Sequence, residues 1–157
     1  MPEGQEADIG EATKGEAGKD GLGFLVADVF RLMRREFGRR LDASELTFAQ
    51  ARALVYIARL EGARQVDLAE MLEIAPMTLA RQIDQLESAG YVERRADAKD
   101  RRAHLMHLTA AASAPLDAIG NVIAAVRQDA LTGLTPTEAA AVTAGLRKMR
   151  QNMVAVQ

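Results

Sequence analysis

The chain has 157 residues, of which 48% are hydrophobic and 27% are charged, a composition typical of one globular domain with or without an oligomerisation element. It has no cysteine, which excludes disulfides and thiol sensing, and no membrane-length apolar run or signal-peptide pattern, so we expect a cytoplasmic protein. The net charge is -2, but residues 1–20 hold six of the 22 acidic residues and two of the 20 basic ones, which leaves basic residues in excess elsewhere.

Residues 1–20 are rich in Gly, Glu and Ala and poor in large apolar residues, which indicates a disordered acidic tail. Over 22–41 the apolar residues recur at helical spacing and predict an amphipathic helix. Thr47 and Gln50 have the spacing of a capping box, in which each side chain bonds the other residue's backbone N–H. They predict a second helix that runs to about Leu60.

A short third helix is predicted over about 66–72, followed by a tight connection at 73–75. The fourth helix begins near Pro76, because proline is favoured in a first helical turn. It ends near Gly90, because glycine is the usual C-terminal cap.

Two short strands, at 91–95 and 103–108, are joined by a charged loop and predict a hairpin. A fifth helix opens at 108–109, with Pro115 either inside it or at its true start. Thr135 and Glu138 form a second capping box that predicts a sixth helix. Its apolar stripe consists of Val142, Leu146, Met149 and Met153. This order of elements predicts a mainly α fold with a small β-hairpin, an α+β arrangement.

The helix that begins near Pro76 has two faces of different character. Leu79, Ile83 and Leu86 share the face that can pack on a core. The opposite face holds Thr78, Arg81, Gln82 and Gln85, and the end that would enter a groove first holds Pro76 and Met77. Arg can bond guanine O6 and N7 in a fork, and Gln can bond adenine N6 and N7 likewise, so this face favours base reading in the major groove. In isolation it also fits an ordinary solvated surface.

The hairpin that follows is basic, with Arg94, Arg95, Lys99, Arg101 and Arg102 within nine residues. Such a hairpin suits contact with phosphates and the minor groove. Asp97 and Asp100 are expected to structure the loop, Asp100 by bonding backbone N–H groups or a neighbouring Arg. Helix and hairpin together predict a winged helix-turn-helix. Its predicted DNA-binding residues are Pro76, Met77, Thr78, Arg81, Gln82, Gln85, Lys99, Arg101 and Arg102.

Residues 66–109 closely resemble the MarR family of bacterial regulators, in particular its SlyA-like branch. The family wing ends in D-x-R-D-R-R before a strand and Leu-Thr, and this chain has Asp97-Ala98-Lys99-Asp100-Arg101-Arg102 and then Leu108-Thr109. The family's helix pattern appears as Leu68-Ala69, Ile74, Thr78, Arg81, Leu86-Glu87, Gly90, Val92 and Glu93-Arg94. The resemblance extends over about residues 22–153.

Two positions depart from the family pattern. Lys99 stands where the family has its first wing Arg, and Lys inserts less well into a narrow minor groove, so we expect Arg101 or Arg102 to take this role. Ala75 stands where a polar helix cap is common, which weakens the start of the next helix by about 1 kcal/mol.

The resemblance implies a sequence-specific regulator of transcription, commonly a repressor, that binds a pseudo-palindromic operator as a homodimer. It implies that the first, fifth and sixth helices form the dimer. The apolar stripes of the last two helices agree, since they have no obvious partner in one chain. We therefore divide the chain into an acidic tail (1–20), an N-terminal dimerisation helix (21–46), a winged helix-turn-helix domain (47–108) and C-terminal dimerisation helices (109–157).

No cofactor is expected, but MarR-like proteins often bind small aromatic acids between the dimer helices and the DNA-binding lobe. This implies an effector pocket in which Arg31, Arg34 or Arg35 receives a carboxylate and Tyr56 contacts a ring. Each of these residues also fits an ordinary surface or dimer position.

Two other function classes compete with DNA binding. An enzyme is not indicated, because the chain has no Gly-rich phosphate loop and no nucleophile with a base. His104 and His107 lie three apart on a strand and point to opposite faces, so they cannot chelate one metal ion together. The alternative is a winged-helix protein-interaction module without DNA binding, which the acidic tail and the negative net charge favour.

Overall fold

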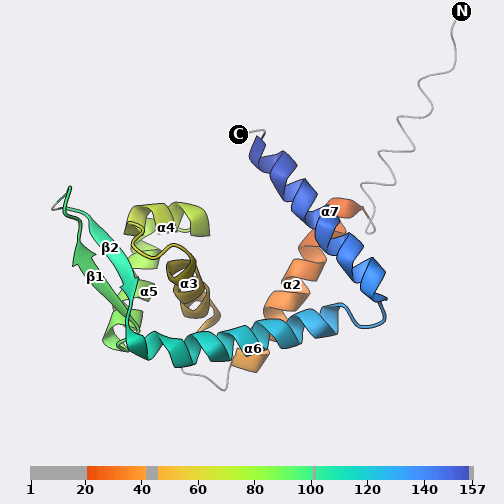
Figure 1. Cartoon of the computed structure of the whole chain (residues 1–157), viewed down its shortest axis with the longest axis horizontal. Helices are drawn as coiled ribbons and strands as arrows, with labels where there is room; N and C mark the ends of the chain where they lie inside the picture. The colour runs from red at the N-terminus through yellow and green to blue at the C-terminus, as the bar shows by residue number, and fades with distance from the viewer. Residues whose placement is uncertain (1–20, 42–45, 101, 156–157) are drawn as a thin grey trace, which may run out of the picture.

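The structure is a computed structural model, and it describes residues 21–41, 46–100 and 102–155. The elements within these residues are α2 (Leu22–Leu41), α3 (Phe48–Arg59), α4 (Gln65–Leu72), α5 (Pro76–Ser88), β1 (Val92–Ala96), β2 (His104–Leu108), the 3₁₀ helix η1 (Ala110–Ala112), α6 (Ser113–Ala130) and α7 (Pro136–Ala155) (Figure 1). The predicted order of elements and the mainly helical fold class are confirmed. The acidic tail predicted at 1–20 lies outside the described residues.

The hairpin is tied at its base to the segment between α3 and α4. β1 and β2 pair antiparallel, with Val92 opposite Leu108. The backbone N–H of Gly62 donates to the carbonyl of Met106 at 2.9 Å, and the N–H of Met106 donates to the carbonyl of Ala63 at 3.0 Å. The connection between α3 and α4 therefore forms a short bridge along β2 and ties the base of the wing to the lobe.

A single hydrophobic cluster holds α3, α4, α5 and the wing together. α5 contributes Leu79, Ile83 and Leu86, which pack with Leu68 of α4 and Met106 of β2, and all five side chains are fully buried. Because these three residues of α5 point inward, the rotation of α5 about its axis is set, and the residues between them are turned to the surface.

α6 follows the wing and extends beyond the lobe to α2 (Figure 1). Pro115 is the third residue of α6, so it marks the start of that helix, where its missing N–H removes no helical bond. Ile119 is buried in the core of the winged-helix lobe. Val126, two turns later, is buried where α6 meets α2. One helix thus packs on both parts of the molecule.

α7 runs back from the far end of α6 and buries no residue in the single chain (Figure 1). It begins with the predicted capping box. The N–H of Thr135 donates to Glu138 Oε2 at 2.8 Å, and the N–H of Glu138 donates to Thr135 Oγ1 at 3.3 Å. Its apolar stripe is exposed: Val142, Leu146, Met149 and Met153. No helix in the described part of the chain is long and apolar enough to cross a membrane.

Candidate nucleic-acid interface

The polar face of α5 lies on the surface of the winged-helix lobe. Its exposed residues are Thr78, Arg81 and Gln85, and Gln82 beside them is half-buried. At the N-terminal end Pro76 is exposed and Met77 is 75% exposed. The structure therefore brings all the predicted residues of α5 to one accessible surface, opposite the leucine and isoleucine side chains that anchor the helix.

The N-terminus of α5 carries no negative side chain. Ala75 is the N-cap residue and makes no side-chain cap bond, while its carbonyl accepts from the N–H groups of Thr78 and Leu79 at 2.9 and 3.1 Å. The first turn contains no acidic residue. The positive end of the helix dipole is therefore not neutralised by a carboxylate of the helix, and this favours an approaching phosphate.

Asp97 is held inside the wing and is only 9% exposed. Its Oδ1 accepts from the backbone N–H of Lys99 at 2.8 Å, and its Oδ2 accepts from Arg64 Nη2 at 2.7 Å. The hydrogen bond from Lys99, and then that from Arg64, holds the pKa of the Asp97 carboxyl below its ordinary value of 3.8. Because Arg64 is the N-cap residue of α4, this charged pair ties the wing to the helical lobe.

Asp100 closes the turn at the tip of the wing. Its Oδ1 accepts from the backbone N–H of Arg102 at 3.0 Å, and its carbonyl accepts from the N–H of Ala103 at 2.9 Å. These are bonds of the kind predicted for this residue. The side chains of Lys99 and Arg102 are exposed around it, whereas Arg101 lies outside the described residues.

Two of the basic hairpin residues are ion-paired within the chain. Arg94 pairs with Asp84 at 2.6 Å and also with Glu87, both on α5. Arg95 pairs with Glu93 of the same strand. Neither Arg94 nor Arg95 belongs to the predicted DNA-binding set, which includes only the cations at positions 99, 101 and 102 of the hairpin. The structure balances these two charges locally, so the cationic surface of the wing is its tip.

Two residues outside the predicted set, Arg64 and Gln50, contact members of it. Arg64 pairs with Asp97, and Gln50 Nε2 donates to Gln85 Oε1 at 2.9 Å. The paired residues are 33 and 35 positions apart in the chain, so no local sequence pattern connects them. The structure confirms the predicted capping box of Thr47 and Gln50. That box indicated only that Gln50 caps the start of α3.

Three of the four predicted effector residues meet at one surface depression of about 350 Å³. Arg31, Arg34 and Arg35 line it together with Phe30 and Phe48. The guanidinium carbon of Arg34 lies 5.1 Å from the ring centre of Phe48, within the range of a cation–π contact. The depression thus combines positive charge with aromatic surface.

Tyr56 does not line this depression of the single chain. It lines a separate depression of about 240 Å³ together with Phe37 and Ile123. The guanidinium carbon of Arg52 lies 5.8 Å from the ring centre of Tyr56. Phe48, about two turns earlier on α3, lines both depressions and stands between Tyr56 and the arginines of α2.

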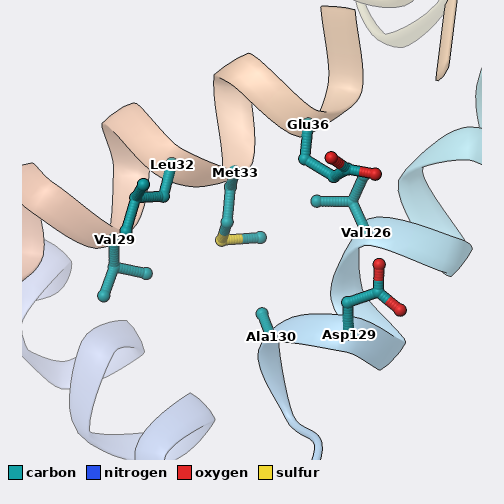
Figure 2. A pocket seen from close by; sticks show the side chains of 7 residues that line it. All are labelled: Val29, Leu32, Met33, Glu36, Val126, Asp129 and Ala130. Carbon is teal, nitrogen blue, oxygen red and sulfur yellow. The ribbon is translucent and has the colours of Figure 1, made fainter. Parts of the chain in front are cut away.

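A further depression, of about 270 Å³, lies between α2 and α6 (Figure 2). Its apolar lining consists of Val29, Leu32, Met33, Val126 and Ala130, and its acidic lining of Glu36 and Asp129. Arg40 pairs with both carboxylates, and hydrogen bonds from Arg39 and then Arg40 lower the pKa of Glu36 to about 2. The acids are therefore balanced within the chain, and what the depression offers a partner is apolar surface.

The two histidines lie apart, as their spacing predicts. His107 Nδ1 is 3.6 Å from Glu61 Oε1, while the side chain of His104 is exposed. Among the described residues there is no group of three or more His, Cys, Asp and Glu that could hold a metal ion.

An exposed polar helix beside a wing with a cationic tip, on a lobe of three packed helices, defines a winged helix-turn-helix protein. A sequence model of the MarR family matches residues 46–104. A mutant of MarR from E. coli is 28% identical, with a TM-score of 0.76 over 82% of this chain and 95% of that chain. The E. coli mutant complexed with operator DNA is also 28% identical, with a TM-score of 0.70 over 82% of this chain and 92% of that chain.

A transcriptional regulator of the MarR family from Silicibacter pomeroyi is 27% identical, with a TM-score of 0.75 over 88% of this chain and 94% of that chain. The match to the MarR family model thus covers the segment that carries α3, α4, α5 and most of the wing. The fold from α2 to α7 is that of MarR winged-helix structures.

Proposed function

We propose that the chain is a sequence-specific regulator of transcription that binds double-stranded DNA in the cytoplasm and, on its wing sequence, belongs to the SlyA-like branch. The observation that carries the proposal is the exposed polar face of α5 together with a wing whose tip exposes Lys99 and Arg102. The similar E. coli protein that was crystallised with operator DNA supports it.

In this function α5 enters the major groove with its N-terminal end first. Arg81 presents a fork of N–H donors to guanine, and Thr78 and Gln82 lie within a turn of it on the same face. The wing tip follows the sugar–phosphate backbone, where Lys99 and Arg102 neutralise phosphates. α5 therefore supplies the sequence preference, and the wing supplies affinity that does not depend on sequence.

The test compares Arg81→Ala and Arg102→Ala in a fluorescence anisotropy assay on promoter duplexes. Arg81→Ala should lose about tenfold or more of its preference for the specific site. Arg102→Ala should weaken binding to all duplexes alike and reduce the salt slope by about 1. Arg127→Ala, at the far end of α6, is the matched control and should change neither. Unchanged binding in both test variants would eliminate this interface.

The active species in this proposal is a homodimer formed by α2, α6 and α7. α2 and α7 expose apolar side chains that a single chain does not cover, and the depression between α2 and α6 adds apolar surface beside them. Two-fold symmetry would set the two α5 helices about 34 Å apart, one turn of duplex DNA, so the operator would be a pseudo-palindrome.

The proposed mode of action is repression that a small aromatic acid relieves. The depression with three arginines offers a carboxylate its charge partners, and Phe30 and Phe48 offer a ring its stacking surface. Titrating benzoate into the protein–DNA complex tests this: release of DNA should need less acid for the wild type than for Arg34→Ala. If millimolar benzoate releases no DNA from either protein, this site is not an effector site for that class of acid.

A further inference from the structure

Gln50 links a helix cap to the proposed DNA-reading surface. It is the third residue of α3, where its side chain completes the capping box with Thr47. The other end of the same amide reaches Gln85 on α5, with Gln50 Nε2 and Gln85 Oε1 2.9 Å apart. The side chain therefore connects the start of one helix to the polar face of another.

The direction of these hydrogen bonds follows from one group that can only donate. The backbone N–H of Thr47 lies 2.7 Å from the Gln50 amide, so the Gln50 atom facing it must be the acceptor, Oε1. Thr47 Oγ1 donates to the same oxygen at 2.9 Å. Gln50 Nε2 then has to point away from the cap, and the Gln85 atom it meets must be Oε1.

Gln85 is left with one kind of hydrogen-bonding group for an incoming ligand. Its Oε1 is engaged by Gln50, and no other hydrogen bond of its side chain is found within residues 21–41, 46–100 and 102–155. Its Nε2, which carries two N–H donors, is therefore the group available on the exposed face of α5.

We propose that Gln50 is a positioning residue that makes Gln85 a hydrogen-bond donor toward DNA and thereby sets its base preference. This rests on the proposed DNA-binding function. A donor suits the acceptor atoms of the major groove, which are guanine O6 and N7, adenine N7 and thymine O4, and not the cytosine amino group. The two-bond fork to adenine also needs the amide oxygen to face the groove, and Gln50 holds Gln85 Oε1 toward α3. The adenine fork expected for the glutamines is therefore favoured at Gln82 over Gln85.

The variant that tests this is Gln50→Glu, which keeps the cap and removes the donor. A carboxylate accepts from both groups of Thr47 and has only an acceptor left to offer Gln85. Gln85 would then turn its Nε2 inward and present Oε1 outward, as an acceptor for cytosine or adenine amino groups. The chain itself shows that Glu completes such a box, since the N–H and the Oγ1 of Thr135 both donate to Glu138 Oε2 at 2.8 Å.

The experiment selects binding sites for the full chain from a library of randomised duplexes. Gln85→Ala identifies the base position that depends on Gln85. There the wild type should prefer guanine or thymine to cytosine by up to about tenfold, and Gln50→Glu should reduce or invert this ratio. Each ratio compares bases within one protein, so the uniform repulsion between an added carboxylate and DNA cancels.

Glu138→Gln is the matched control. It replaces a carboxylate by an amide in the capping box of α7, whose hydrogen bonds involve no residue of α5. It should leave every base preference unchanged, and circular dichroism should show Gln50→Glu folded like the wild type. The inference is overturned if Gln50→Glu leaves the base preference of the wild type intact, or if Gln85→Ala changes the preference at no base position. In either case the proposed DNA binding stands. A wild-type chain that enriches no duplex at all overturns the proposed function and the inference with it.

Discussion

Asp97 shows how one residue can serve the interface without touching DNA. It is nearly buried, and both of its oxygens are used, one by the backbone of the wing and one by Arg64. Its pKa is lowered in the folded chain, so its contribution to stability is fully present above the ordinary pKa of 3.8 and is lost only as the pH falls below it. The Asp97 carboxylate is therefore charged at neutral pH, and changes of pH near neutrality do not break its pair with Arg64.

Asp97→Asn should weaken binding to all duplexes by about two- to fivefold, the range expected for a partly exposed ion pair, without changing base preference. The amide can still accept from the N–H of Lys99, but it no longer attracts Arg64, so the wing is held less firmly. Asp100→Asn is the control, because that carboxylate accepts the N–H of Arg102 and forms no salt bridge with the described residues of the wing. Anisotropy titrations on specific and random duplexes measure both. A loss confined to the specific duplex would contradict the proposed role.

At the scale of single elements, the start of α5 is a compromise between helix stability and charge. α3 and α7 each begin with a complete capping box, whereas α5 begins at Ala75 without a side-chain cap. An acidic cap would stabilise α5, but it would also place a negative charge at the end of the helix that is proposed to approach phosphates.

Ala75→Ser and Ala75→Asp separate these two effects. Both should stabilise the fold by about 1 kcal/mol, because each side chain can accept an N–H of the first turn, and thermal unfolding should rise by about 2–4 °C. Only Ala75→Asp should weaken DNA binding, and its loss should shrink as salt is added. Thr47→Ala, which removes an existing cap far from the N-terminus of α5, should lower the unfolding temperature by a similar amount. Equal DNA affinities for the Ser and Asp variants would contradict the argument.

Elements with local signals were predictable from the sequence, and contacts between elements were not. Pro76 and the boxes at Thr47 and Thr135 act over three or four residues, so they marked helix starts correctly. The spacing of Leu79, Ile83 and Leu86 likewise predicted which face of α5 is buried.

The pairing of Arg94 with Asp84 and Glu87, by contrast, depends on how β1 lies against α5. The separation of Tyr56 from the arginines of α2 depends on where α2 crosses α3. Neither arrangement is encoded in a short stretch of sequence, because both arise only when the helices pack.

At the scale of the whole molecule, the helices outside the winged-helix lobe are incomplete as a single chain. α7 buries nothing, and Leu146 in the middle of its apolar stripe is 48% exposed. Leu146→Asp should weaken the proposed dimer by at least about 100-fold, because burying a leucine side chain contributes about 1.5–3 kcal/mol and each dimer has two copies. Light scattering over a concentration series measures the change in mass.

Gln151→Asp is the matched control, since it adds the same charge on the opposite side of α7. Gln151→Asp should remain dimeric and should bind DNA like the wild type. Leu146→Asp should lose both dimerisation and DNA binding. A wild-type chain that stays monomeric at micromolar concentration, or a Leu146→Asp variant that stays dimeric, would rule out this face as the interface.

The continuity of α6 has a mechanical consequence. Its 18 residues span about 27 Å without a break, with Ile119 clamped in the lobe and Val126 clamped against α2. Because the helix is continuous, a tilt where it meets α2 would be carried along it to the winged-helix lobe at its other end. In the proposed function, a molecule that separates α2 from α6 would therefore release DNA without contacting the polar face of α5.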